Sequence, residues 1–341
     1  MIWAEAEGCR VVDTDRRSYI DLSGGFGVAA LGHRNPEIGA AVSAQADRCV
    51  HALGDLAEAD VTAELRARLG GDGRDAMLGV TGEDAVELAL RTALLVTGRP
   101  GIVAFTGAYH GTGLLALAAT GFEEFRDPFA AWLPGPVHRR PYGEDPGPLP
   151  GDTACVIVEP VQGRAGAHVP PDGFLERLRE RCDEAGALLI VDEIYTGLGR
   201  TGALWRSGDL ADLLTCGKAL GGGLPISACL MRAEHRSAWD LGPEDVYTHT
   251  HMGNPLAAAA GLVVLDRVPA LLERVMAAGE RFEAAGWHGA GLLRAKAGNA
   301  FAAWERGVIV IPAGEDGRYM SATPPLTITD DEIDEALELI G

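Results

Sequence analysis

Lysine is almost absent from this chain, and one of its two lysines lies in a glycine-rich segment. The 341 residues include 27 arginines but only Lys218 and Lys296, and Lys218 stands within residues 215–223. An amine can lose its proton near neutral pH and attack a carbonyl carbon, whereas a guanidinium stays protonated. Lysine at position 218 therefore indicates a nucleophilic amine, although scarcity alone fits a surface residue equally well.

Acidic residues lie at the ends of two predicted strands that precede Lys218. Glu159 ends one strand, and Asp192 ends the next, 26 residues before Lys218. An acid at one strand end and a lysine near the next are the pair that a pyridine cofactor requires. The acid keeps the ring nitrogen protonated, and the lysine holds the aldehyde as a Schiff base. In open α/β sheets, ligands bind outside the carboxyl ends of the strands, so we expect the chemistry there.

Short apolar runs alternate with helical patterns from about residue 77 onward, which predicts an α/β core of parallel strands and crossover helices. The expected strands are residues 77–80, 101–105, 154–159, 187–192, 213–216 and 226–231. The clearest helices are residues 82–96 and 171–185.

The two ends of the chain differ in character from this core. An amphipathic helix near residues 254–285, a strand at 307–311 and a final helix at 330–340 predict a smaller α+β unit. Strand and turn signals in the first 35 residues suggest that they join it. We therefore expect a large cofactor-binding domain over 36–258 and a smaller domain from 1–35 and 259–341.

Composition limits the partners and the location. The formal charge of −20 argues against nucleic acid, which leaves small molecules as the expected ligands. The N-terminus lacks signal-peptide features, and no apolar stretch is expected to approach the roughly 18 residues of a membrane span, which predicts a cytoplasmic protein without membrane contact. The six cysteines form no CxxC pair and should be reduced and mostly buried; no metal site is expected.

Seven segments, spread over nearly the whole chain, together carry a family resemblance. They are residues 21–28, 31–36, 108–111, 159–163, 191–202, 253–258 and 324–329. In order and spacing they resemble the class III (ω-) aminotransferases, which are fold-type I pyridoxal 5'-phosphate (PLP) enzymes. The resemblance implies a large domain with a mostly parallel sheet, a smaller α+β domain, and transfer of an amino group between an amine or amino-acid donor and a carbonyl acceptor.

The resemblance also assigns roles around the cofactor ring. Lys218 matches the lysine that forms the Schiff base and moves the substrate proton, and Asp192 matches the partner of the pyridinium nitrogen. Tyr109, followed by His110, matches the aromatic residue on one face of the ring, and Ile194 matches the apolar residue on the other. Asp192 could otherwise be a helix cap and Tyr109 a core residue.

Further roles concern the phosphate and a nearby acid. The turn at Thr81 and Gly82 matches the phosphate-binding turn, where free N–H groups at a helix start favour an anion. Thr250 matches a threonine that reaches the phosphate of the neighbouring subunit, which implies a homodimer. Glu159 matches an acid whose role varies in the family, and a buried structural carboxylate is the commoner alternative.

Two departures from the family pattern lie next to the cofactor. Glu83 puts a carboxylate where the phosphate turn usually has a hydroxyl, so it would repel phosphate unless its side chain points away. We expect the backbone N–H to stay in use, with somewhat weaker phosphate affinity. Tyr195 stands where many members have a glutamine near the phenolic oxygen of the cofactor, and its hydroxyl could donate the same hydrogen bond.

Two further departures concern the substrate. Ser321 replaces an arginine that usually holds an α-carboxylate, and Arg318 should lie on the opposite strand face. Arg139, Arg140 and Arg164 could bind a carboxylate or could be solvated surface charges. The chain is also short for the family, which suggests a more open site, possibly for a bulky or carrier-linked substrate.

Two alternatives to transamination stay open at this point. The scaffold also hosts PLP-dependent decarboxylation, epimerisation, elimination and carbon–carbon bond formation, and the fold does not decide among them. A cofactor-free homologue is the second alternative, motivated by Glu83 and the short chain. Lys218, Asp192 and Thr250 argue against it. Lys296 has no matching motif and should be a solvated surface residue.

Overall fold

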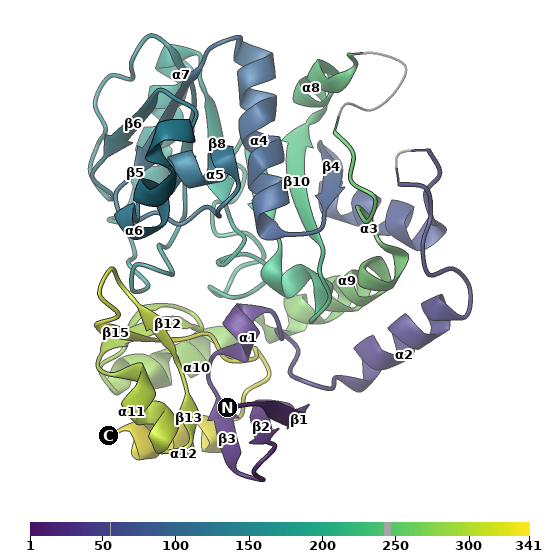
Figure 1. Ribbon diagram of the computed structural model, residues 1–341, viewed down its shortest axis with the longest axis vertical. Helices are drawn as coiled ribbons and strands as arrows, with labels where there is room; N and C mark the ends of the chain where they lie inside the picture. Colours follow the sequence, from purple (N-terminus) through teal and green to yellow (C-terminus); the bar gives the residue numbers. More distant parts are fainter. Residues whose placement is uncertain (55, 242–246) are drawn as a thin grey trace.

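The protein is built around a seven-stranded sheet, seen in a computed structural model that describes residues 1–54, 56–241 and 247–341 (Figure 1). The strand order is β4-β10-β9-β8-β7-β5-β6. β10 runs antiparallel to β4 and β9, and the other neighbours are parallel. The strands are β4 (Arg74–Gly79), β5 (Gly101–Phe105), β6 (Val137–Arg140), β7 (Thr153–Val158), β8 (Leu188–Asp192), β9 (Leu213–Cys216) and β10 (Ser227–Arg232). The predicted α/β fold with a mostly parallel sheet is confirmed.

Helices cover both faces of this sheet, because successive strand residues point to opposite sides. On β8, Leu189 and Val191 join the core under α7 and α9, whereas Leu188 and Ile190 join the core under α4 and α5. The helices around the sheet are α2 (Pro36–Ala46), α3 (Asp60–Gly70), α4 (Gly82–Thr97), α5 (Leu114–Ala119), α6 (Glu123–Arg126), α7 (Phe174–Ala185), α8 (Ala233–Arg236) and α9 (Pro255–Arg267). Short 3-10 turns are η1 (Asp127–Trp132), η2 (Lys218–Gly221) and η3 (Ser237–Trp239).

Two four-stranded sheets lie beside the large sheet, and one of them joins the two ends of the chain. β3 pairs in parallel with β13, so N-terminal and C-terminal segments share one sheet (Figure 1). The strands of this sheet are β1 (Trp3–Glu7), β2 (Arg10–Asp13), β3 (Ser18–Asp21) and β13 (Val308–Ile309). The other sheet, in the order β11-β12-β15-β14, holds β11 (His288–Ala290), β12 (Leu293–Ala297), β15 (Tyr319–Ala322) and β14 (Ile311–Ala313). The expected domain boundaries stay a prediction.

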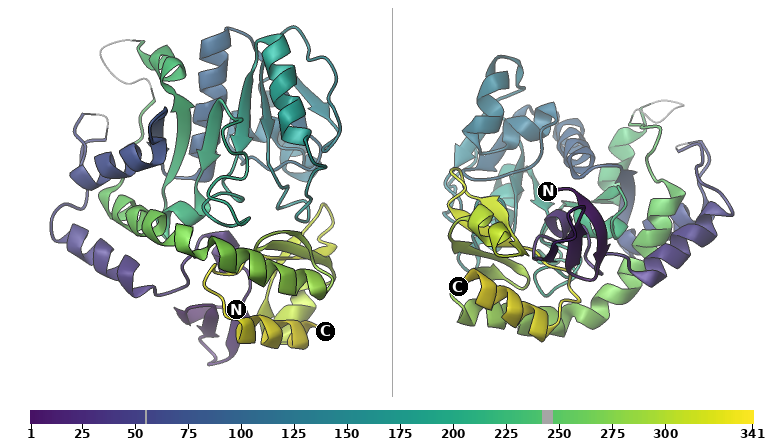
Figure 2. Two further views of the ribbon diagram at one scale, coloured as in Figure 1. Left: turned by 180° about the vertical axis from the view of Figure 1, so that it is seen from behind. Right: turned by 60° about the horizontal axis from the view of Figure 1, so that its bottom comes forward.

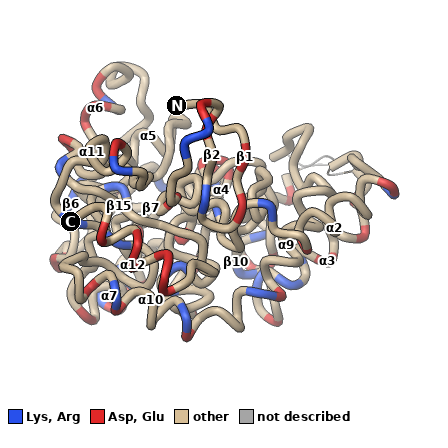
Figure 3. The backbone as a smooth tube through the Cα atoms, turned by 90° about the horizontal axis from the view of Figure 1, so that it is seen from below, with Lys and Arg blue, Asp and Glu red and all other residues tan. Residues whose placement is uncertain are grey.

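The remaining helices are α1 (Gly24–Gly27), α10 (Leu272–Ala284), α11 (Ala300–Glu305) and α12 (Asp330–Ile340). Six of the eleven residues of α12 are acidic, and they appear as a red stretch beside α10 in Figure 3. Arg281 of α10 pairs with Asp334 at 2.8 Å, and Arg10 of β2 pairs with Glu335. Part of the chain's large negative charge is thus placed next to arginines of neighbouring elements.

Two expectations about the C-terminal part were wrong. The single helix expected near 254–285 is α9 and α10, separated by the 3-10 turn η4 (Val268–Leu271), where Pro269 cannot continue a helix. The strand expected at 307–311 is divided between β13 and β14, because the chain changes sheets after Ile309.

The expectation that no apolar stretch approaches the length of a membrane span was also wrong. Pro255–Ala284 is long and apolar enough to span one by length and composition. In this structure, however, α9 packs against α2 and α3, and its residues Ala258, Ala260 and Val264 are fully buried (Figure 2). The apolar character of α9 is therefore used in the protein core.

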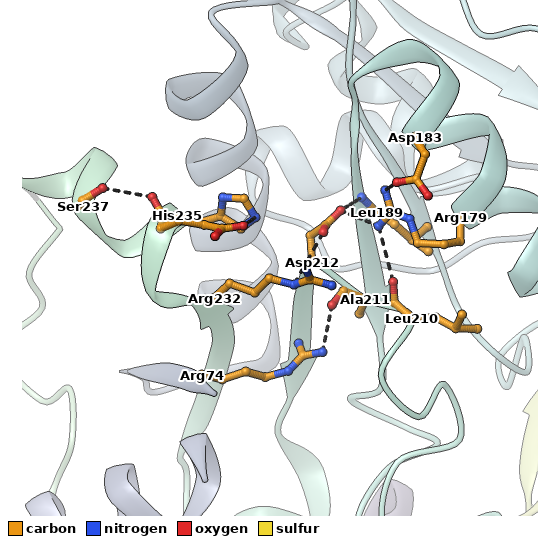
Figure 4. Close-up of polar contacts among 11 residues, drawn as sticks. Arg74, Arg179, Asp183, Leu189, Leu210, Ala211, Asp212, Arg232, His235 and Ser237 are labelled. Atoms are coloured by element: carbon orange, nitrogen blue, oxygen red, sulfur yellow. Dashed lines mark hydrogen bonds and ion pairs between the residues drawn. The ribbon is translucent and has the colours of Figure 1, made fainter. Parts of the chain in front are cut away.

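A cluster of arginines surrounds Asp212 at the edge of the sheet opposite the carboxyl strand ends. Arg179 donates to Asp212 at 2.6 Å, and Arg232 approaches the carboxylate from the other side at 3.8 Å (Figure 4). Arg74 faces Arg232 across the β4–β10 pair and donates to the carbonyl of Ala211. Asp212 offsets repulsion between these cations, so the cluster has a structural explanation.

Candidate active site

The carboxyl ends of five parallel strands meet the smaller sheets around a cavity of about 560 Å³. Figure 1 shows α1 and β15 below this edge of the large sheet. Ten of the eleven predicted site residues line the cavity: Thr81, Gly82, Glu83, Tyr109, His110, Glu159, Asp192, Ile194, Tyr195 and Lys218. They follow β4, β5, β7, β8 and β9, so strands far apart in the sequence bring them together at one edge.

Lys218 stands two residues after the end of β9 and extends its amine over an aromatic ring. Its Nζ lies 4.2 Å from the centroid of the Tyr195 ring. Burial lowers the pKa of the amine, and the negative charges of Asp192 and Glu159 oppose this effect. Its backbone has a φ of 26°, a strained conformation for a residue with a side chain. The amine is therefore held in place and is easier to deprotonate than an exposed lysine.

Asp192, the last residue of β8, is held by three hydrogen bonds. Its Oδ2 accepts from His110 Nδ1 at 2.8 Å. Its Oδ1 accepts from the Thr215 hydroxyl at 3.2 Å and the Ile194 N–H at 3.1 Å. These contacts fix the orientation of the Asp192 carboxylate in the cavity, with His110 as its neighbour.

The turn after β4 forms the start of α4. Thr81 caps this helix, because its hydroxyl accepts from the Asp84 N–H and the Asp84 carboxylate accepts in return from the Thr81 N–H. The N–H groups of Gly82 and Glu83, in the first turn of the helix, have no intrahelical acceptor. Both residues line the cavity, so these N–H groups and the helix dipole suit an anion there.

The Glu83 side chain is turned away from this turn. Its Oε2 accepts from the N–H of Thr112 at 3.0 Å, the hydroxyl of Thr112 at 3.1 Å and the N–H of Gly113 at 3.1 Å. The Glu83 carboxylate is engaged by the 112–113 loop, so the repulsion of phosphate that the sequence led us to expect is reduced. The weaker phosphate affinity stays a prediction.

Tyr109 and Ile194 approach the cavity from the segments that follow β5 and β8, respectively. The Tyr109 N–H donates to the Glu159 carboxylate at 2.8 Å, and its ring makes edge contacts with Phe122 and Phe125. Ile194 packs against the phosphate turn, where a Cβ added at Gly82 would lie 3.1 Å from it. These contacts fix an aromatic and an aliphatic side chain in the same cavity.

Tyr195 is oriented by its neighbours on two sides. Any side chain at Gly163 would collide with its ring, so glycine is required there. The Tyr195 hydroxyl lies 3.4 Å from the Thr323 hydroxyl, and burial raises its pKa. The hydrogen bond from Tyr195 to a cofactor oxygen stays a prediction.

Glu159 is a buried acid with little compensating charge. It is 5% exposed, and burial raises the pKa of its carboxyl to about 7, with the charge of Asp192 adding to this effect. His110 and the Tyr109 N–H oppose the shift. Glu159 is thus a proton-holding group within the cavity near neutral pH.

This raised pKa predicts how the stability of the cofactor-free protein depends on pH. The unfolded chain loses the Glu159 proton near pH 4.5 and the folded chain near pH 7, so stability falls as pH rises between these values. The loss should be about 3 kcal/mol. Glu159→Gln stays neutral, so its free energy of unfolding relative to that of wild type should rise by about this amount from pH 5 to pH 8, measured by urea unfolding. A difference in stability that does not change with pH would contradict the prediction.

Residues outside the eleven predicted site residues also line the cavity. Arg164, one of three candidate arginines, lines it together with Ser321, Phe26 and Pro312. Arg164 could have been favoured because it follows the strand end at Glu159 by five residues. Phe26 lies in the segment 21–28, which carries part of the family resemblance, but the resemblance assigned it no role, and nothing in the local pattern marked Pro312.

The other basic residues considered from the sequence lie elsewhere. Arg318 pairs with Asp316 at 2.7 Å, and Arg139 donates to the carbonyls of Ala118 and Thr120. Arg140 and Lys296 are half-buried, on β6 and β12, and neither lines the cavity.

Thr250 is the predicted site residue that the cavity does not include. It is exposed, in the turn that leads to α9. A threonine that serves a neighbouring subunit would be exposed in a single chain. The position is compatible with the expected role but does not test it.

Residues 1–285 match the family model of the class-III aminotransferases. The chain belongs to this family. The acetylornithine aminotransferase of Methanopyrus kandleri is 40% identical over 284 residues, which cover 81% of this chain and 72% of the relative. The 5-aminovalerate aminotransferase of Pseudomonas aeruginosa is 37% identical over 309 residues, covering 82% and 71%.

A solved structure shows the same fold over almost the full chain. The ornithine aminotransferase of Toxoplasma gondii superposes with a TM-score of 0.91 at 28% identity, covering 99% of this chain and 89% of that one, and was seen with PLP at partial occupancy. This chain is accordingly a PLP-dependent aminotransferase of fold type I. Its cavity fits PLP in chemistry, since it offers an amine, an oriented carboxylate and free helix N–H groups for a phosphate.

Proposed function

We propose that this aminotransferase moves an amino group from an amine or amino acid to a carbonyl compound with Lys218 as the attachment point of PLP. The observation that carries the proposal is the Lys218 amine, with its lowered pKa, in one cavity with the carboxylate of Asp192. PLP supplies, when bound, an aldehyde and an electron-withdrawing ring. Lys218 Nζ can hold the aldehyde and afterwards carry the proton that moves on the substrate.

The other residues position and protect the cofactor in this proposal. Asp192 would keep a proton on the ring nitrogen of bound PLP, and His110 orients Asp192 through their hydrogen bond. The N–H groups of Gly82 and Glu83 would hold the phosphate. Tyr109 and Ile194 would pack against the ring and exclude water.

Transamination can be distinguished from the other PLP reactions by its stoichiometry. Purified protein is loaded with PLP and mixed with single amine donors in the absence of an acceptor. We expect about one pyridoxamine 5'-phosphate per subunit, measured after release by chromatography, together with an equal amount of the oxo product. Product formation by decarboxylation or elimination, without pyridoxamine 5'-phosphate, would contradict the proposal.

We further propose a homodimer in which Thr250 of one subunit binds the cofactor phosphate of the other. Thr250→Ala should lower PLP affinity about tenfold, because a hydrogen bond to a charged group is lost. Thr250→Ala and Lys218→Ala subunits, co-expressed with different tags, should form mixed dimers. Each mixed dimer would contain one intact site and should show about half of wild-type activity per dimer at limiting PLP, whereas each parent protein should show little.

Mixed dimers without this recovery would place Thr250 in its own subunit's site or outside any site. A monomer by light scattering would also contradict the arrangement.

The location and the substrate size are also proposals. We place the enzyme in the cytoplasm, which its six free cysteines support, five of them buried. The cavity of about 560 Å³ is of the size that binds small molecules. A bulky or carrier-linked substrate stays a prediction.

A further inference from the structure

Arg164 carries a positive charge into the cavity without an acidic partner. Among the residues that the structure describes, none forms a hydrogen bond or an ion pair with its side chain, although the residue is half-buried. Burial is the main cause that lowers the pKa of Lys218, and the charge of Arg164 adds to it, so Arg164 acts on a residue of the same cavity. A guanidinium placed in this way has five donors ready for an anion.

The Arg164 guanidinium is held by aromatic rings, which do not occupy its donors. Its central carbon lies 5.2 Å from the ring centroid of Tyr109 and 5.1 Å from that of Phe125. Its backbone carbonyl accepts from the Gly314 N–H at 2.8 Å. The loop after β7 is thus fixed to the segment that follows β14, and the side chain is preorganised.

The carboxylates that line the cavity do not neutralise Arg164. Glu83 is engaged by Thr112 and Gly113, and Asp192 by His110 and its other two donors. Glu159 binds the Tyr109 N–H. Among the described residues that line the cavity, two keep a buried polar atom without a hydrogen-bond partner, namely Nε2 of His110 and the hydroxyl of Ser321 on β15. A guanidinium and a free hydroxyl are donors that a carboxylate can use.

We propose that Arg164, assisted by Ser321, binds the carboxylate of the substrate while the reacting amine lies at Lys218. The charged part of the anchor then comes from the loop after β7, and position 321 on β15 contributes only a hydroxyl. The substrate class is an amine that also carries a carboxylate. This inference rests on the proposed function, because the reacting amine must reach Lys218.

The test compares each acid with its neutral amide of the same shape. The PLP-loaded enzyme receives 5-aminovalerate, 4-aminobutyrate or L-alanine and the corresponding amides, and kcat/KM of the amino-transfer half-reaction is measured. Wild type should prefer the acid in at least one pair. Arg164→Gln should lose about 10- to 100-fold in kcat/KM for that acid and change little for its amide. Arg164→Lys should lie between them, and Ser321→Ala should lose less than Arg164→Gln.

A binding measurement makes the test independent of turnover. Calorimetry of the PLP-loaded protein should detect valerate binding to wild type but not to Arg164→Gln, and valeramide should bind neither. Arg140→Gln is the matched control, because Arg140 is a half-buried arginine outside the cavity, and it should behave as wild type. The PLP content of each variant is measured after release and should be equal.

The outcomes distinguish a failure of the role of Arg164 from a failure of the proposed reaction. Equal valerate binding by wild type and Arg164→Gln, or no binding to wild type, overturns the role of Arg164 and leaves amino transfer intact. An Arg164→Gln variant that keeps the wild-type preference for acids also overturns it. If no amine transfers its amino group but valerate binding still depends on Arg164, the anchor holds and the proposed reaction fails.

Discussion

Replacing Lys218 by alanine should lower kcat/KM for amino transfer by about 10⁴-fold. The change removes the group that we propose to hold PLP and to move the substrate proton, and proton transfer by a positioned side chain alone contributes up to this factor. Lys296, the other lysine of the chain, cannot substitute for the lost amine, because it lies on β12 outside the cavity. Activity is measured with the best donor found for wild type, at saturating PLP.

Two variants distinguish the chemistry of Lys218 from its charge. Lys218→Arg keeps a cation at the position but cannot supply a free amine, so it should be as inactive as alanine. Lys296→Ala should keep wild-type activity. Borohydride treatment followed by mass spectrometry should find PLP on the peptide that contains Lys218 in wild type. An active Lys218→Arg enzyme, or a label on another residue, would contradict the assignment.

Most of the fold could be predicted from the sequence because its strands are apolar and buried on both faces. β5 and β9 have the predicted bounds, and the same pattern placed β7 and β8 within one residue. β4 begins three residues earlier than predicted, at Arg74. Its first residues are polar, and they extend the strand because they pair with β10.

The positions of the site residues could be predicted for a related reason. Glu159, Asp192 and Lys218 stand at or just after the carboxyl ends of parallel strands, and such ends meet at one edge of a sheet whatever the loops between them do. Ten of the eleven residues therefore line one cavity. Thr250 is different, because it lies outside this cavity and the role that we propose for it depends on a second subunit.

Side-chain orientation in the loops could not be predicted in this way. Glu83 seemed to threaten the phosphate turn, and only the contact with the 112–113 loop shows that its carboxylate is engaged elsewhere. Arg139 and Arg140 lie on β6 and do not line the cavity, whereas Arg164 lies in the loop after β7 and does. Periodicity gives no side-chain direction for Arg164, because the chain follows neither a helix nor a strand there.

Asp192 and Glu193 are neighbouring acids in one motif, but their surroundings differ. Both are buried, yet Asp192 lines the cavity and Glu193 does not. Glu193 accepts from the hydroxyls of Thr196 and Ser207 and from the Ser207 N–H, so it closes the loop after β8. Burial raises the pKa of Glu193, which is consistent with a structural carboxyl group. The pair therefore provides a natural comparison for a test of Asp192.

Asp192→Asn should lower kcat/KM for amino transfer by about 10²- to 10³-fold, the cost of losing one preorganised electrostatic contact in an active site. The asparagine keeps the shape of the side chain and can still accept from the Ile194 N–H, but it has no charge to hold a proton on the ring nitrogen of PLP. His110 also loses its anionic partner. Bound PLP should remain measurable, because Lys218 and the N–H groups of the α4 turn are unchanged.

Glu193→Gln is the matched control, since it removes a buried carboxylate one residue away. We expect it to lower the melting temperature and to leave kcat/KM within a few-fold of wild type for the protein that stays folded. Full activity of Asp192→Asn in the presence of PLP would show that the Asp192 carboxylate has no electronic role. An equal loss of activity in both variants would mean that the Asp192 carboxylate only supports the strand end. A charge that acts on the cofactor must be specific to the acid that lines the cavity.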